Sequence, residues 1–166
     1  MSISASVLPE FDQEMATTRT MLERVPESRA SWTPHSKSRT LGELASHICN
    51  LPKLGLITME ADELDVAAGG SGKAPRFAST VGLMHTFDDN VRRARAAIES
   101  ATDSDMMEPW TLRNAGKTVW TLPRAAVLRS FILSHMIHHR GQLSVYLRLN
   151  DVPLPPVYGP SADTQM

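Results

Sequence analysis

Apolar residues recur every three or four positions in four segments of the chain, which is the period of an amphipathic α-helix. Pro26 ends the first segment, and Pro9 is expected in its first turn, where a helix tolerates proline. The second segment begins at Thr40, because Thr40 and Glu43 have the spacing of a capping box. Pro52 lies inside this segment and is expected to remove a backbone hydrogen bond and kink the helix.

Two further helices are predicted in the second half of the chain. The third begins at Ser79 or Thr80, since either side chain can cap a helix. The fourth extends over about 122–150, with Pro123 in its first turn. The apolar stripe of the third helix consists of Met84, Phe87, Val91, Ala94 and Ile98.

The segments between the helices differ in character. Residues 65–78 are predicted to form a loop, because they contain the glycine-rich stretch 69–72. Two short β-prone runs, 110–113 and 117–120, flank Asn114-Ala115-Gly116 and predict a small hairpin. These features predict an all-α fold, a four-helix bundle with long connections and a β-hairpin before the last helix. We expect one domain over 1–166, with a proline-rich, extended tail over 151–166.

Composition narrows the classes of partner. The chain has 166 residues and a formal net charge of −1, so its charge gives no case for a nucleic-acid or membrane partner. The N-terminus lacks the features of a signal peptide, and no apolar run is long enough for a transmembrane helix. Its one cysteine, Cys49, excludes an intrachain disulfide. We therefore expect a cytoplasmic protein.

Histidines replace apolar residues on two of the predicted helical stripes. His135 and His139 are four residues apart and lie about 40° apart around the helix, so both imidazoles can reach one ion. His47 likewise lies on the apolar stripe of the second helix, although spacing leaves open whether it faces the pair. Three histidines would make a divalent-metal site with an open position for water or substrate. The alternative is that each is a core histidine hydrogen-bonded to a neighbour, and His138 could replace either histidine of the pair.

Neighbouring residues refine the expected chemistry. Zinc proteases of the H-E-x-x-H type have a glutamate base directly after the first histidine, whereas this chain has Met136. Asn50, His138 and Gln142 are candidates for contacts to the ligand histidines or to a substrate. For Asn50 and Gln142, an ordinary hydrogen bond between helices is the alternative.

The residues around these histidines are similar to those of a known family. The stretches 134–143 (SHMIHHRGQL), 146–148 (YLR) and 155–163 (PPVYGPSAD) resemble the DinB family, which is related to the YfiT-like metal-dependent hydrolases, as does 34–38 (PHSKS) with 44–47 (LASH). The resemblance implies a bundle with metal ligands at His47, His135 and His139. It also implies zinc or nickel as the metal, a homodimer packed through bundle helices, and, in some relatives, a low-molecular-weight thiol as cosubstrate.

Two functional hypotheses follow from the sequence. The first is a metal-dependent enzyme, a thiol transferase or a hydrolase, that activates a thiol or water at the three-histidine site. The second is a non-catalytic metal-binding or stress-response structural module, in which metal adds folding stability. DNA binding, which only the damage-inducible name of the family suggests, has no support from the net charge.

Overall fold

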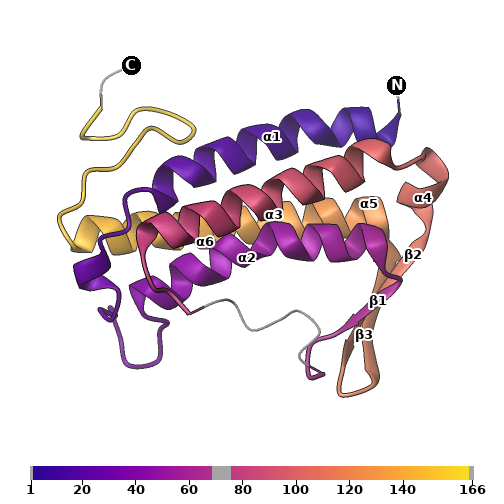
Figure 1. Cartoon of the computed structure of the whole chain (residues 1–166), viewed down its shortest axis with the longest axis horizontal. Coiled ribbons are helices and arrows are strands. Elements are labelled where there is room, and N and C mark those ends of the chain that lie inside the picture. The colour runs from indigo at the N-terminus through magenta and orange to yellow at the C-terminus, as the bar shows by residue number, and fades with distance from the viewer. Residues whose placement is uncertain (1, 69–75, 165–166) are drawn as a thin grey trace.

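Four long helices form the body of the molecule and lie roughly side by side (Figure 1). The computed structural model describes residues 2–68 and 76–164. The helices are α1 (Ile3–Leu22), α2 (Leu41–Glu60), α3 (Thr80–Ser100) and a last rod that ends in α6 (Ser134–Leu149). Helix α2 packs against α3 and α6, and α1 packs against the same two helices. The expected four-helix bundle is therefore confirmed.

The helix starts follow from side-chain caps. Thr40 and Glu43 form the predicted capping box, with Thr40 Oγ1 accepting from the Glu43 amide at 3.2 Å and the Glu43 carboxylate accepting from the Thr40 amide at 2.8 Å. Ser79 caps α3, as expected. Helix α1 begins earlier than predicted because Ser2 caps it, so Pro9 lies in its second turn and not in its first. Helix α2 continues through Pro52.

A small sheet covers one end of the bundle (Figure 1). The predicted hairpin is present as β2 (Pro109–Asn114) and β3 (Lys117–Pro123). Its turn has positive φ angles of 50° at Ala115 and 76° at Gly116, as a type I′ turn requires. The last helix therefore begins at Arg124 and not at Leu122, because Pro123 is still paired with Pro109 across the hairpin.

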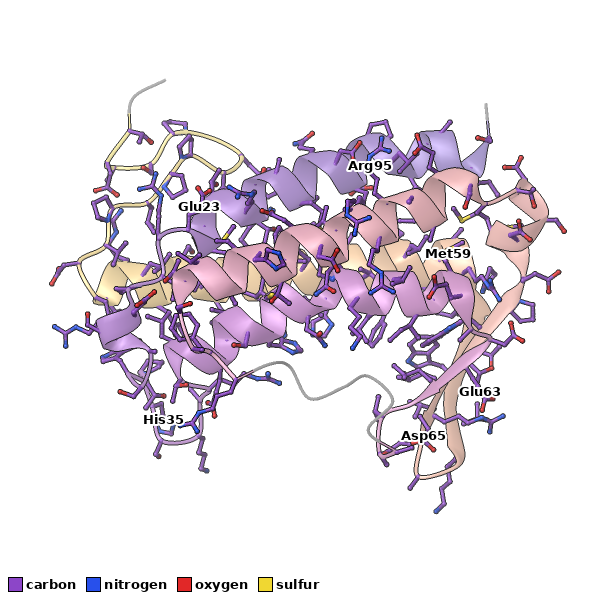
Figure 2. All side chains as sticks on the ribbon, viewed as in Figure 1. Glu23, His35, Met59, Glu63, Asp65 and Arg95 are labelled. Atoms are coloured by element: carbon purple, nitrogen blue, oxygen red, sulfur yellow. The ribbon has the colours of Figure 1, made fainter. Side chains whose placement is uncertain are left out.

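One strand of this sheet was not predicted. Strand β1 (Glu63–Asp65) pairs in parallel with β2, so Asp65 belongs to a strand and not to the expected loop. The Asp65 carboxylate accepts from the amides of Ala115 and Gly116 at 3.0 and 2.6 Å, which ties β1 to the turn of the hairpin. Figure 2 shows Asp65 and Glu63 together at this end of the molecule, opposite the loop that carries His35. The glycine stretch 69–72 lies outside the described residues.

Two more short elements differ from expectation. A single helical turn, α4 (Asp103–Met107), precedes the hairpin and has its own capping box from Thr102 and Asp105. The 3₁₀ turn η1 (Glu27–Arg29) follows α1. None of the helices in the described ranges is long and apolar enough to cross a membrane.

The last rod is not a uniform α-helix. It begins as α5 (Arg124–Ala126), becomes a π-helix, η2 (Val127–Leu133), and continues as α6. At the end of η2 the Ser134 amide donates to the Arg129 carbonyl, five residues earlier. π-Helical segments within α-helices are rare and are frequent at functional sites. This one ends at Leu133, two residues before His135.

A buried ion pair fixes α6 against α1. Arg140 and Glu14 are 2% and 5% exposed, and Arg140 Nη2 lies 2.6 Å from Glu14 Oε2. The Tyr158 hydroxyl donates to the same carboxylate at 2.9 Å, which holds the C-terminal tail on this pair. Arg140 also donates to the Glu14 carbonyl and to Thr18 Oγ1. Arg140 is thus a structural residue, as its position off the histidine stripe indicates.

Candidate metal centre

The three predicted histidines meet between α2 and α6. The centroid of the His47 ring lies 5.1 Å from that of His135 and 4.5 Å from that of His139, and the rings of the α6 pair are 4.7 Å apart. Nε2 of His47 is 3.2 Å from Nε2 of His135. One nitrogen from each ring lies within 4.8 Å of the other two. His47 therefore faces the pair, which its position in the sequence alone could not establish.

This arrangement fits a first-row divalent metal. Ligand nitrogens about 2.0–2.1 Å from a tetrahedral zinc ion lie about 3.3 Å from each other. The 3.2 Å between the His47 and His135 nitrogens matches that spacing. Among the described residues, no cysteine, aspartate or glutamate joins the group, so all its donors are imidazole nitrogens. Imidazole donors suit zinc, copper, iron and nickel, whereas magnesium and calcium prefer oxygen ligands.

Burial keeps the three rings neutral. The pKa of His47 is lowered to about 3 and that of His135 to about 4, and burial is the largest cause of both changes. Positive charge on Arg39 and on neighbouring rings lowers both values further. Burial also lowers the pKa of His139, while its hydrogen bond to Gln142 opposes that change. A neutral imidazole has a free lone pair, which metal binding requires. The site is therefore ready for a cation at neutral pH.

Gln142 orients one of the rings. Its Oε1 atom is 2.7 Å from Nδ1 of His139, which assigns the proton of that ring to Nδ1 and leaves Nε2 as the acceptor. Metal-binding histidines characteristically donate their second nitrogen to such a partner. Of the other candidates, His138 is exposed and lies beside His139 without joining the group. Asn50 is buried one turn after His47, and its contact with the site stays a prediction.

The sheet contributes to the position of His135. Rings of Trp110, Trp120, Phe131 and His135 lie in sequence, with centroids 5.7, 5.3 and 5.6 Å apart. Phe131 belongs to the π-helical segment, so this segment places its ring between the hairpin and the histidine. The chain of rings connects the core under the sheet to the histidine cluster.

Two residues near the cluster were not singled out by sequence reasoning. Arg39 precedes the α2 capping residue, and its charge lowers the pKa of each of the three histidines. Ser46 is buried, and its hydroxyl has no hydrogen-bond partner among the described residues. No periodicity could identify Arg39, because it lies in a loop. Ser46, next to His47, could have been noted as a polar residue in an apolar run.

Cys49 is not part of the cluster. Its side chain is fully buried and its thiol donates weakly to the Leu83 carbonyl at 3.4 Å. Burial raises the pKa of this thiol to about 12. Cys49 is thus an inert packing residue.

Comparisons with known proteins agree with the resemblance seen in the sequence. Residues 10–143 match the family model described as the DinB superfamily. The uncharacterised protein YrdA of Bacillus subtilis (strain 168) is 23% identical over 156 residues, which are 94% of this chain and 88% of YrdA.

Solved structures show the same fold. A DinB-like protein from Bacillus cereus ATCC 10987 superposes with a TM-score of 0.72 at 21% identity, covering 91% of this chain and 95% of that one. The DinB-like protein YjoA of Bacillus subtilis superposes with a TM-score of 0.69 at 20% identity, covering 90% and 96%. All three histidines lie within the residues that match the family model.

Proposed function

This chain belongs to the DinB superfamily, and from that premise we propose that it is a metal-dependent enzyme that acts on a small molecule. His47, His135 and His139 would hold a divalent ion, with zinc or nickel expected. The observation that carries the proposal is the meeting of three neutral imidazoles, one nitrogen from each within 4.8 Å of the others. Three protein ligands are the number typical of catalytic sites, since structural zinc sites usually have four.

A divalent metal with three nitrogen ligands lowers the pKa of a water or thiol in its open position. Among the described residues, no carboxylate joins the cluster to act as a base. Met136, at the position where zinc proteases have glutamate, is fully buried. A thiol ionises more readily than water and needs less help from a base. We therefore favour transfer of a low-molecular-weight thiol to an electrophilic substrate, with hydrolysis as the second form.

The reacting thiol would come from a cosubstrate. Cys49 is the only cysteine of the chain, and it is fully buried with a pKa raised to about 12. It is thus poorly suited to act as a nucleophile. The residues of the chain would instead bind and orient: Gln142 holds the His139 ring, and Phe131 packs against the His135 ring.

Metal analysis and turnover test the proposal together. Purified wild-type protein is expected to contain about one zinc or nickel ion per chain, and His139→Ala to contain much less. Metal-loaded protein is then assayed for conjugation of glutathione, bacillithiol or mycothiol to chlorodinitrobenzene and related electrophiles. His138→Ala is the matched control, because His138 is exposed and outside the cluster. Equal rates for wild type and His139→Ala would refute catalysis at this site.

A non-catalytic role is the alternative, and one observation favours it. The histidines come from two helices, so a metal there would link α2 to α6 and add folding stability. Thermal unfolding with and without a chelator separates the two roles. A large loss of stability without metal, combined with no activity on the substrate panel, would support a structural module. Little change in the melting temperature together with metal-dependent turnover supports the enzyme.

A further inference from the structure

A cavity of about 730 Å³ lies beside the first two turns of α2. Its walls include Arg39, Gly42, Ser46, Arg76 and Phe77. The volume falls within the range of about 300–1,000 Å³ that is usual for small-molecule sites. Gly42 allows this wall to close, because a Cβ atom there would lie 3.0 Å from Phe77 Cβ and 3.1 Å from the Ala30 carbonyl oxygen.

The cavity and the histidine cluster occupy neighbouring faces of α2. Residues four apart lie above one another on a helix, so Gly42 and Ser46 form one row and Glu43 and His47 form the next. Both residues of the first row line the cavity, as does Glu43 of the second row, and His47 of the second row belongs to the cluster. The cavity is therefore next to the cluster along α2, although His47 itself does not line it.

Arg39 connects the two places. It lines the cavity, and its carbonyl accepts from the Tyr146 hydroxyl at 3.3 Å. Tyr146 lies on α6 two turns after His139, so this contact holds the Arg39 backbone against the helix that carries the pair. The positive charge of Arg39 also acts on all three histidines.

The cavity carries positive charge that the described residues leave unpaired. Neither Arg39 nor Arg76 makes an ion pair with a described carboxylate, whereas most of the other described arginines do. Glu43 also lines the cavity, but its carboxylate is engaged by the Thr40 amide. Two guanidinium groups and one carboxylate give a net charge of about +1, which matches a monoanion better than a dianion.

The amides at the start of α2 are already used. The Leu41 amide donates to the Trp32 carbonyl at 2.8 Å, and the Gly42 amide donates to the Ala30 carbonyl at 2.9 Å. An anion in the cavity would therefore depend on the guanidinium groups and not on the helix terminus.

The buried hydroxyl of Ser46 independently indicates that the cavity binds a ligand. The residue is 3% exposed, and its hydroxyl lacks a hydrogen-bond partner among the described residues. A buried hydroxyl without a hydrogen-bond partner costs free energy, and a hydrogen bond to a ligand atom would remove that cost. Ser46 lines the main cavity and also a smaller one of about 210 Å³, which shares Arg76 and Phe77. A ligand oxygen between Arg76 and Ser46 would satisfy both.

We propose that this cavity binds the carboxylate of a small molecule with an apolar portion, Arg39 and Arg76 pairing with the carboxylate, Ser46 donating to it and Phe77 packing on the apolar part. Arginine suits this role because its planar fork matches a carboxylate with two parallel hydrogen bonds. That the bound molecule then reacts at the histidines rests on the proposed function. Its binding does not.

The test is an NMR titration with three probes that share one ring: phenylacetate, phenylacetamide and phenyl phosphate. It uses metal-free full-length protein from which the chelator has been removed, because common chelators are themselves carboxylates. Phenylacetate is expected to bind at least about tenfold tighter than phenylacetamide, and Arg39→Gln or Arg76→Gln to weaken it about tenfold. Arg93→Gln, an exposed arginine of α3 that lines a different cavity, is the matched control and should leave Kd unchanged.

Ser46→Ala gives a further readout. It should weaken phenylacetate about threefold and leave thermal stability equal or higher, because the variant no longer buries an unpartnered hydroxyl. The proposal is overturned if phenylacetamide binds as tightly as phenylacetate, if phenyl phosphate binds tighter, or if Arg93→Gln weakens binding as much as the two cavity variants do. Since no metal is present, these outcomes are independent of catalysis at the histidines.

Glutathione and its diethyl ester then identify the source of the carboxylate. If the thiol cosubstrate supplies it, glutathione binds and competes with phenylacetate, while the ester does not. If the electrophilic substrate supplies it, neither form competes, although phenylacetate still depends on Arg39 and Arg76. Each result supports the site. The first assigns the carboxylate to the thiol cosubstrate, and the second assigns it to the electrophilic substrate.

Discussion

At the residue scale, the hydrogen bond between Gln142 and His139 decides which ring nitrogen is available. With Nδ1 engaged by the Gln142 oxygen at 2.7 Å, Nε2 is the nitrogen that keeps a free lone pair. Partners of this kind typically account for a factor of 10–100 in metal affinity or activity. The effect of Gln142 on a bound metal therefore is expected to be large for a residue that is not itself a ligand.

Gln142→Ala is expected to weaken zinc binding by about tenfold. The affinity is measured by competition with a chromogenic chelator. His138→Ala serves as the control, since His138 is close by but exposed. Unchanged affinity in Gln142→Ala would mean that the ring of His139 is oriented by packing alone.

The lowered pKa values of the cluster predict how acid affects the metal-free protein. A histidine in the unfolded chain titrates near its ordinary pKa of 6.5, whereas in the folded protein the pKa of His47 is about 3 and that of His135 about 4. Between these values the unfolded state binds more protons, so stability is greatest above pH 6.5 and falls as the pH decreases toward 4.

His47→Gln should make this loss smaller. Urea unfolding of metal-free protein at pH 7.5, 6.5, 5.5 and 4.5 measures it, and the difference between variant and wild type removes the contribution of carboxylates. His85→Gln, an exposed histidine on α3, is the control. The same pH slope in wild type and His47→Gln would contradict the assigned pKa.

At the scale of elements, the Arg140–Glu14 pair joins the last helix to the first. Removing one partner of a buried ion pair leaves an uncompensated charge, which costs about 3–5 kcal/mol. Arg140→Met is therefore expected to lower the free energy of unfolding by about that amount, measured by urea denaturation. Adding Glu14→Leu should restore much of the loss, because an apolar pair can replace a buried ion pair.

An exposed pair provides the comparison. Arg92 and Asp89 are 72% and 42% exposed, so Arg92→Ala should cost less than about 1 kcal/mol. A similar cost for Arg92→Ala and Arg140→Met would mean that burial does not strengthen the dependence on the pair.

The elements that sequence predicted are those whose signals are local. Helical periodicity, the Thr40–Glu43 capping box and the turn at Asn114-Ala115-Gly116 each depend on a few neighbouring residues, and all are present. Strand β1 was missed because it has three residues and pairs with a strand almost fifty positions away. The π-helical segment was missed because a change from α to π geometry leaves the apolar pattern of the segment almost unaltered.

The same distinction applies to the site. The pair His135 and His139 follows from helical spacing, since both lie on one helix. The approach of His47 depends on how α2 packs against α6, and spacing along one helix contains no such information. Arg39 lies in a loop and acts across space, so only the three-dimensional arrangement connects it to the histidines.

At the scale of the whole molecule, the homodimer that the resemblance implies stays a prediction. Light scattering over a range of concentrations should give about twice the chain mass of 18.3 kDa. Val145 and Leu149 are 56% and 58% exposed, one turn apart on α6, so replacing both with glutamate should give a monomer if α6 forms the interface. Val119→Glu on the hairpin, where the valine is 54% exposed, is the control. A monomer for the wild type at every concentration would contradict the prediction.

The π-helical segment has a consequence for how this chain can gain or lose residues. Its hydrogen bonds reach five residues back where an α-helix reaches four, so the rod contains one residue more than a regular α-helix of that length would. Deleting one exposed position there, such as Ser130, would return the rod to α geometry and leave its two ends in about the same relative orientation, because the π-helical turn accommodates the extra residue locally. The contact of His135 with His47 would then be kept, and only the backbone around the deleted position would change. In any alignment of relatives, a one-residue gap between the hairpin and the histidine pair would therefore indicate a regular α-helix in place of the π-helical turn, with the histidine site unchanged.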